Sequence, residues 1–354
     1  MVEIGLVGHG SLLCLSSGTR RVADARPACK GMRPMGKVDE EPGFVPPAPD
    51  AVARDLAPLA VDAPPVLRFA PSPNGRLHPG HAYSALLNRR LADAHGGRML
   101  IRIEDLDETR CTSALERAAL ADLAATGVAS DGPVMRQSER GEAYAAALRG
   151  LRARGLLYPT HLSRGAIRRF VAEREAGGRI WPRDPDGAPH YPRGADVGPD
   201  ESARLIADGA PHGLRLDMTR AAPEAGPLSW DEDGCGGLGR TDSIAADPTR
   251  WGDPQLARVE GGRLRAAYHL AVVVDDAAQG ITHVVRGRDL REATDLHRLL
   301  QALLGLPTPS YRHHALVLAP DGGKLSKSRG DAGLAAYGPG IAERLGFGPF
   351  DERT

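Results

Sequence analysis

The sequence predicts an α/β protein with a doubly wound parallel sheet and a smaller, inserted substrate-binding subdomain. Two short apolar runs, at 66–70 and 99–105, have the length and composition of buried strands. A Pro- and Gly-rich turn and a helical pattern at 80–94 lie between them. Strand, helix and strand at this spacing form a βαβ unit, which implies parallel strands joined by a right-handed crossover.

Further elements lie on both sides of an irregular stretch. Helices are predicted at 113–126, 139–155 and 164–176. The stretch 177–255 is rich in Gly, Pro and Asp and contains one strand candidate, at 213–217. A regular pattern then resumes, with an apolar segment, a strand, a helix and a last apolar segment at 268–276, 281–286, 293–304 and 315–318.

These patterns divide the chain into five segments. Residues 1–65 contain Pro-rich stretches without sustained periodicity, so we expect a disordered leader there. The catalytic domain is expected in two halves, at 66–160 and 263–330, around an insertion at 161–262. A short tail at 331–354 completes the chain.

Composition limits the class of protein. The 354 residues are 42% hydrophobic and 25% charged, with a formal net charge of zero, which argues against a generic nucleic-acid coat protein. There is no run of 18 apolar residues, so no membrane span or membrane partner is expected. The four cysteines form no CxxC pair, which predicts a reducing, cytoplasmic protein without a thiolate metal site.

The distribution of lysine indicates a functional loop. Of the 45 lysine and arginine residues only four are lysine, and beyond residue 38 the only ones are Lys324 and Lys327. Where arginine serves everywhere else, two clustered lysines indicate a site that needs a compact, mobile ammonium group. The alternative is a solvated charged loop.

The motif His78-Pro79-Gly80-His81 follows the first strand's turn and opens the following helix. In a doubly wound sheet, ligands bind where strand ends meet helix N-termini. Glycine allows a nucleotide to approach the backbone, and two imidazoles can donate to phosphate oxygens. The alternative is a pair of surface or cap histidines, because this short motif alone is weak.

The two motifs together predict nucleotidyl transfer to a carboxylate. Such a transfer needs no general base, because the nucleophile is already ionised. Its barrier is mostly charge developing on the phosphates, which positioned cations and donors stabilise. The expected catalytic residues are therefore His78, His81, Lys324 and Lys327.

Seven segments together resemble class I glutamyl-tRNA synthetases in identity and order: 68–73, 78–81, 102–105, 137–140, 268–276, 285–287 and 324–328. The resemblance covers about 66–330 and implies a Rossmann-like catalytic domain that uses ATP and Mg²⁺ to activate glutamate. By resemblance, the ATP-binding residues would be Ser72, His78, Gly80, His81, Lys324 and Lys327.

The same resemblance implies a glutamate site. Arg68 and Arg286 would hold the carboxylates, Glu104 the amine, and Ser72 and Tyr268 the backbone side. The chemistry agrees, because arginine offers a bidentate fork to a carboxylate. Strand alternation places Arg102 on the same face as Glu104; the alternative for these two is a simple ion pair at a strand edge.

Full-length members of the family carry an anticodon-binding domain after the loop at 324–328, whereas this chain ends 26 residues beyond Ser328. In this respect it resembles the truncated glutamyl-queuosine tRNA(Asp) synthetases. The implied partners are glutamate and queuosine-modified tRNA(Asp), and the enzyme is expected to be a monomer. The implied reaction activates glutamate without tRNA and esterifies it onto queuosine at the first anticodon position.

The chain departs from the family at a zinc knob. Thr160 and Leu162 stand where relatives have cysteines, and 190–194 also lacks one, so zinc is not expected. His161 and His190 are interpreted as surface histidines. Asn74 replaces the usual threonine of the turn after the first strand, which a turn tolerates.

Three alternatives stay open on sequence alone: a truncated glutamyl-tRNA synthetase that charges a tRNA 3′ end, a non-catalytic tRNA-binding paralogue, and a plain nucleotidylyltransferase. Basic residues that could contact RNA phosphates are Arg149, Arg152, Arg154, Arg164, Arg168 and Arg169.

Overall fold

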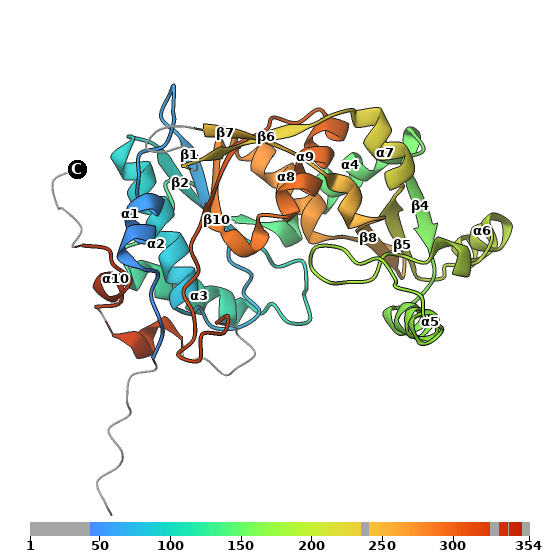
Figure 1. The fold of residues 1–354 in the computed structure, drawn as a ribbon, viewed down its shortest axis with the longest axis horizontal. Helices are drawn as coiled ribbons and strands as arrows, with labels where there is room; N and C mark the ends of the chain where they lie inside the picture. The colour runs from blue at the N-terminus through green and yellow to red at the C-terminus, as the bar shows by residue number, and fades with distance from the viewer. Residues whose placement is uncertain (1–42, 235–240, 326–332, 339, 349–354) are drawn as a thin grey trace, which may run out of the picture. The chain divides into compact units, whose positions relative to one another are not determined.

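The computed structural model describes residues 43–234, 241–325, 333–338 and 340–348, and its main feature is a parallel sheet (Figure 1). One part of the sheet has the order β1-β2-β3, all parallel, with β1 at Val66–Phe69, β2 at Arg98–Ile103 and β3 at Met135–Arg136. The predicted βαβ unit and its parallel pairing are thereby confirmed.

The other part of the sheet has the order β10-β11-β6-β7, with β10 at His283–Gly287, β11 at Ser310–His314, β6 at Ser229–Asp233 and β7 at Thr241–Ala245. The first three strands are parallel, and β7 runs antiparallel to β6. Thr282 N donates to Val66 O at 3.0 Å, which places β10 beside β1. The carboxyl ends of β1 and β10 therefore lie next to each other.

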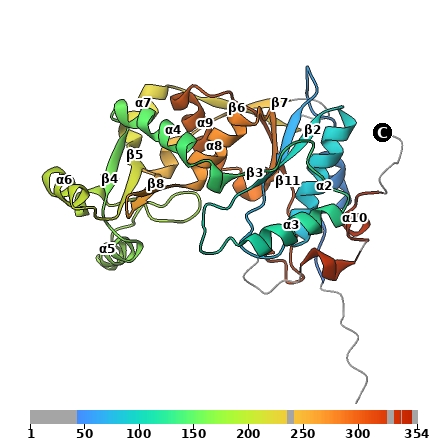
Figure 2. The ribbon, with the colours of Figure 1, turned by 180° about the vertical axis from the view of Figure 1, so that it is seen from behind.

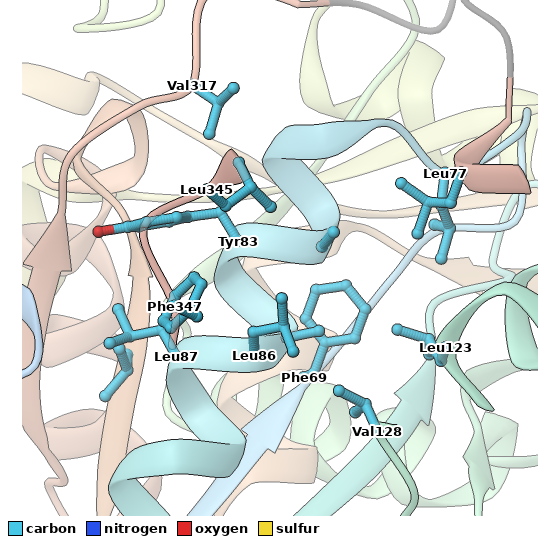
Figure 3. Close-up of a cluster of buried hydrophobic side chains, with 14 of the residues drawn as sticks. Phe69, Leu77, Tyr83, Leu86, Leu87, Leu123, Val128, Val317, Leu345 and Phe347 are labelled. Atoms are coloured by element: carbon cyan, nitrogen blue, oxygen red, sulfur yellow. The ribbon is translucent and has the colours of Figure 1, made fainter. Parts of the chain in front are cut away.

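One face of the sheet is covered by α2 (Pro79–Ala94), which makes the crossover from β1 to β2. Tyr83, Leu86 and Leu87 of this helix pack with Phe69 of β1 in the core drawn in Figure 3. Further cover comes from α3 (Ser113–Ala125). Successive strand residues point to opposite faces, so the burial of Phe69 under α2 directs Arg68 to the other face.

The opposite side of the fold has its own apolar core, built from α4 (Gly141–Ala153), α7 (Met218–Ala225), α8 (Tyr268–Ala278) and α9 (Ala293–Leu304). These helices share the core with an antiparallel sheet of the order β4-β5-β8-β9. Its strands are β4 at Leu157–Thr160, β5 at His212–Leu216, β8 at Gln255–Glu260 and β9 at Arg263–Ala266.

Two helices lie beyond β4, at the end of the antiparallel sheet, as Figures 1 and 2 both show. They are α5 (Arg164–Ala176) and α6 (Pro199–Ala207). Ile167 and Val171 of α5 pack on Tyr191 in a small separate core. Short 3₁₀ turns connect several elements, at Gln137–Glu139, Arg193–Ala195, Pro248–Trp251, Arg288–Leu290 and Leu334–Tyr337.

The segment expected as an insertion, 161–262, does not coincide with one structural unit. Within it, β6 and β7 belong to the same sheet as β10 and β11, where Glu232 of β6 pairs with Tyr311 of β11. Conversely, β4 and β9 lie outside that range and pair within the antiparallel sheet. The strand β6 reads Ser-Trp-Asp-Glu-Asp, so its acidic composition hides a buried strand.

The expectation of a disordered leader over 1–65 is wrong for 43–65; residues 1–42 lie outside the described part of the chain. Here the chain forms α1 (Pro49–Asp55), in which Pro49 occupies a first-turn position that suits proline. Val52 and Leu59 join the core under α2. The backbone of Val45 pairs with Leu318, with N–O distances of 2.8 and 3.0 Å.

Part of the expected tail also packs on the core. Leu334, Ile341, Leu345 and Phe347 are buried against the α2 side, with α10 at Ile341–Arg344. In the described part of the chain, no helix is long and apolar enough to span a membrane.

Candidate active site

A cavity of about 760 Å³ opens at the carboxyl ends of β1 and β10. It is lined by every predicted site residue that the structure describes: Arg68, Ser72, His78, Gly80, His81, Glu104, Tyr268, Arg286 and Lys324. Lys327 falls outside the described residues. Residues separated by more than 200 positions in the sequence thus meet in one cavity because β1 and β10 are neighbours.

The two histidines of the 78–81 motif cap the N-terminus of α2. His78 Nδ1 accepts from Gly80 N at 3.2 Å, and His81 Nδ1 accepts from His78 N at 3.1 Å. A neutral imidazole whose Nδ1 accepts carries its proton on Nε2, which is then a donor of the kind phosphate oxygens need. The cap interpretation and the phosphate interpretation are therefore compatible.

Gly80 is required by the close approach of the His78 ring. A Cβ at this position would lie 3.0 Å from His78 Cε1, which is tighter than most real Cβ contacts. A side chain here would require the ring to shift by a few tenths of an ångström. The glycine thus keeps the helix N-terminus open at the cavity.

Arg68 and Arg102 converge on one carboxylate, that of Asp276 in α8. Arg68 Nε lies 3.1 Å from Asp276 Oδ1, and Arg102 Nη1 lies 2.6 Å from the same oxygen. Arg102 Nη2 also contacts Glu104 Oε1 at 3.3 Å. The strand-edge interpretation of Arg102 and Glu104 was too simple, because the Arg102 side chain is fully buried and shared between two acids.

Burial and the two guanidinium groups act in opposite directions on these carboxylates. Burial raises the pKa of Asp276, but Arg68 and Arg102 outweigh it and hold that pKa below its ordinary value. For Glu104 burial dominates and raises the pKa, because Arg102 and Arg68 offset only part of the cost. A bound ammonium group beside Glu104 would stabilise its ionised form.

Tyr268 begins α8 and lines the cavity beside Glu104. Burial, with the charge of Glu104 nearby, raises the pKa of the Tyr268 hydroxyl to about 12. The hydroxyl therefore stays protonated at neutral pH and can donate a hydrogen bond to a ligand.

Arg286, at the end of β10, is held in a different way from Arg68. Its Nη2 donates to Leu290 O at 3.0 Å and to Thr294 Oγ1 at 2.7 Å. Its Nη1 and Nε meet His297 Nδ1 and His313 Nε2, each at 3.2 Å. All four partners are uncharged acceptors, since burial and the Arg286 charge lower the pKa of both histidines.

Lys324 lies at the end of a turn that is closed by its own β-bridge to Leu318. Ala319 N donates to Gly323 O at 2.8 Å, and Leu318 pairs with Lys324. The lysine side chain is 64% exposed, and its Nζ contacts Asp289 Oδ2. A mobile ammonium at the cavity rim fits a phosphate-binding role.

The sequence resemblance includes the motif at 137–140 and Asp275 but implies no role for them. Gln137 Nε2, Arg140 Nε and Tyr144 Oη donate to Asp275 at 3.0, 3.1 and 2.6 Å. Ser138 donates to Asp105 from both N and Oγ, at 2.8 and 2.6 Å. These contacts fix the ends of β2 and α8, so the motif supports the site without lining it.

Comparison with known proteins decides the family. The class I tRNA synthetase (E and Q) catalytic domain matches residues 66–225 and 259–335. A glutamyl-Q tRNA(Asp) synthetase from Rhodobacter capsulatus is 42% identical over 77% of this chain and 94% of its own length. One from Leptothrix cholodnii is 42% identical over 77% of this chain and 85% of its own. The chain belongs to the glutamyl-Q tRNA(Asp) synthetase family.

Solved structures support the class I synthetase fold. A glutamate tRNA ligase from Elizabethkingia meningosepticum, in complex with its amino acid, aligns with a TM-score of 0.60 and 26% identity over 81% of this chain. A glutamate-tRNA synthetase from Elizabethkingia anophelis aligns with the same score and identity over 80%. This chain spans 54% of the length of each. The predicted class I fold and ligase activity are therefore confirmed.

In this glutamyl-Q tRNA(Asp) synthetase family member, residues 161–162, where zinc is not expected, belong to a hydrogen-bonded cluster. Asp196 Oδ2 accepts from His161 N at 3.0 Å and from Tyr191 Oη at 2.5 Å. Leu162 N donates to Tyr191 Oη at 3.3 Å. Among the residues that the structure describes, no group of three or more His, Cys, Asp or Glu side chains could hold a metal.

The arginines proposed to contact RNA fall into two groups. Arg149 and Arg154 are ion-paired, with Glu142 at 2.7 Å and Glu224 at 2.5 Å. The others are exposed on α4 and α5: Arg152, Arg164, Arg168 and Arg169. Arg152 and the α5 arginines are thus exposed and outside these two ion pairs, and their contact with RNA stays a prediction.

Proposed function

We propose that this enzyme activates glutamate with ATP in the absence of tRNA and transfers it to queuosine at the first anticodon position of tRNA(Asp). The observation that supports the first step is that one cavity is lined both by His78, His81 and Lys324 and by the two arginines proposed to bind carboxylates. The acceptor is supported by the names of the relatives, which are glutamyl-Q tRNA(Asp) synthetases.

At the amino-acid end, each charge of glutamate has a complementary partner. Arg68 and Arg286 supply two guanidinium groups for two carboxylates, and Glu104 supplies an anion for the amine. Ser72 and the protonated Tyr268 hydroxyl supply hydrogen bonds on the backbone side. The pairing of Arg68 with Asp276 fixes the orientation of its guanidinium group.

At the ATP end, donors gather where phosphates would lie. The α-carboxylate of glutamate attacks the α-phosphorus, the bond to the bridging oxygen breaks, and pyrophosphate leaves. The Nε2 groups of His78 and His81, the N-terminus of α2 and the Lys324 ammonium group stabilise the developing negative charge. Lys327 is proposed to join them.

Magnesium carried by ATP would neutralise further phosphate charge. The cavity fits such an ion, because Asp289 places a carboxylate on the Lys324 side of the lining. Asp289 is the residue that could hold it, with phosphate oxygens and water as the other ligands.

The decisive experiment is ATP–pyrophosphate exchange with purified enzyme and glutamate, with no tRNA, using glutamine and aspartate as controls. Exchange with glutamate alone supports the first step. Transfer of labelled glutamate to tRNA(Asp) with queuosine, and not to the same tRNA without it, supports the second.

Exchange that requires tRNA(Glu) would instead identify a truncated glutamyl-tRNA synthetase. No exchange under any condition would indicate a non-catalytic tRNA-binding paralogue. Exchange that does not depend on glutamate would indicate a different nucleotidyl transfer.

A further inference from the structure

The two arginines of the proposed glutamate site differ in whether a protein carboxylate neutralises their charge. Arg68 is paired with the Asp276 carboxylate, whereas Arg286 has no carboxylate within ion-pair distance among the described residues. Arg286 is nevertheless only 4% exposed. A buried guanidinium group without a counterion binds an anion strongly and a neutral amide weakly.

The neighbours of Arg286 must be acceptors, because a guanidinium group can only donate. His313 Nε2 therefore carries no proton where it faces Arg286 Nε at 3.2 Å. The neutral ring then carries its proton on Nδ1, which donates to Glu232 Oε2 at 2.8 Å. His297 follows the same logic, since its Nε2 donates to His269 Nδ1 at 3.1 Å.

Both oxygens of Glu232 are committed. Oε2 accepts from the His313 ring, and Oε1 accepts from the backbone N–H of His313 at 3.0 Å. Glu232 is 3% exposed, so water does not replace either contact. In this arrangement, with one donor on each oxygen, only a carboxylate offers an acceptor to both, because a carboxamide has an NH₂ donor in place of the second oxygen.

We propose that Glu232 and His313 are positioning residues that set the tautomer facing Arg286 and so determine selectivity for glutamate over glutamine. Glu232 fixes the Nδ1–H form of His313. That form presents a lone pair to Arg286, which stays oriented without any carboxylate cancelling its charge. This inference rests on the proposed glutamate site, with Arg286 placed at the side-chain carboxylate, the group by which glutamate differs from glutamine.

Glu232 reaches this position from an unexpected part of the chain. It lies on β6, in the stretch 226–258 that the class I catalytic-domain match leaves out. Pairing of Glu232 with Tyr311 of β11 places its side chain beside His313, two residues further along β11. The positioning residue therefore comes from outside the matched catalytic segments.

The test is the Glu232→Gln substitution. The amide oxygen must accept from the fixed backbone N–H of His313, which turns the NH₂ group toward Nδ1. His313 then shifts its proton to Nε2, where it faces the Arg286 Nε–H. We expect the KM for glutamate in exchange to rise about 10- to 100-fold and the preference over glutamine to fall equally, with the KM for ATP unchanged within about twofold.

Asp231→Asn is the matched control, because it removes the same charge from the neighbouring, exposed position of β6. Its KM values and selectivity should equal those of the wild type. Unchanged glutamate KM and selectivity in Glu232→Gln would overturn the proposal.

A second measurement depends neither on activity nor on the folding of the Glu232→Gln variant. Histidine-selective ¹⁵N NMR of the wild-type enzyme distinguishes Nδ1–H from Nε2–H rings, and loss of one signal in His313→Gln assigns it. Nδ1–H at His313 supports the inference, and Nε2–H overturns it. If wild-type enzyme shows the expected tautomer but no glutamate-dependent exchange, the proposed function fails and the selectivity inference with it, while the Glu232–His313 geometry stands.

Discussion

Arg68 and Asp276 form a buried ion pair, with Nε 3.1 Å from Oδ1, that joins two residues 208 positions apart. It connects β1 to α8, and the same oxygen accepts from Arg102 of β2. One carboxylate therefore orients a proposed substrate-binding arginine and balances a fully buried second one. The catalytic site and the stability of the sheet depend on the same side chain.

Replacement of Asp276 by asparagine should destabilise the enzyme by about 3–5 kcal/mol, because the buried Arg68 loses its counterion and the buried Arg102 loses one of its two. Urea unfolding monitored by circular dichroism measures this change. The KM for glutamate should rise as well, since Arg68 loses its fixed orientation. Glu142→Gln breaks the exposed pair with Arg149 and should cost less than about 0.5 kcal/mol. Equal effects of the two substitutions would contradict the expected role.

The residues that precede β1 should contribute to stability through Asp55. Its Oδ2 accepts from Tyr83 Oη at 2.8 Å and from Ala315 N at 3.0 Å. Asp55→Ala leaves one buried and one half-buried donor unpaired and should cost about 2–4 kcal/mol, whereas Tyr83→Phe should cost about 1 kcal/mol. In the double variant the two losses should not add, which a double-mutant cycle measures. Full additivity would show that the contact contributes nothing.

The elements β1, α2 and β2 were predictable because each carries its own local sequence signal. The apolar runs of β1 and β2, and the caps and periodicity of α2, are complete within about 40 residues, as the βαβ interpretation requires. The acidic strand β6 and the helix α1 were not found. Both are stabilised by distant partners, β6 by β11 and α1 by Arg312, whose guanidinium group donates to the carbonyls of Asp55, Ala57 and Pro58.

The same distinction applies to the site. Residues that would touch the ligands, such as His78 and Arg286, lie in short motifs that sequence comparison can find. The residues that orient them carry no motif of their own: Glu232 and His297 become visible only when β6, β10, β11 and α9 are brought together.

Stability should fall as the solution becomes acidic, because histidines are buried in neutral form. Burial, with the Arg286 charge nearby, lowers the pKa of His269 to about 4, and burial lowers that of His313 to about 4 despite Glu232. Their unfolded-state pKa is about 6.5, so between these values the unfolded chain binds more protons and is favoured.

Each such histidine should remove up to about 1.4 kcal/mol of stability per pH unit below about pH 6.5. Urea unfolding between about pH 7.5 and pH 5 measures the slope. His269→Asn should reduce that slope by the contribution of one proton. An unaltered slope in this variant would show that His269 is not the group that titrates.

The subdomain should not require zinc. The Asp196 carboxylate accepts hydrogen bonds from His161 N and Tyr191 Oη at the place where relatives were expected to hold a metal. Burial and, to a smaller extent, the hydrogen bond to Asp196 raise the pKa of the Tyr191 hydroxyl. A zinc-selective chelator should leave exchange activity and the unfolding midpoint unchanged, with magnesium in excess. Asp196→Ala should lower the free energy of unfolding by about 1–3 kcal/mol. Zinc in the purified enzyme, measured by mass spectrometry, together with inhibition by the chelator, would contradict this expectation.

Lys324 should matter for catalysis and not for folding. Its side chain is 64% exposed and makes its ion pair at the cavity rim, where such pairs stabilise little. Lys324→Ala should reduce ATP–pyrophosphate exchange by about 10²- to 10³-fold, because one cation that stabilises charge on the phosphates is lost. Lys324→Arg keeps the charge but not the compact ammonium group, so its activity should lie between that of the wild type and that of Lys324→Ala. Both variants should unfold in urea at the wild-type midpoint. A Lys324→Ala enzyme with wild-type exchange would place the phosphate-binding cation elsewhere, and a lowered midpoint would show a structural role for this side chain.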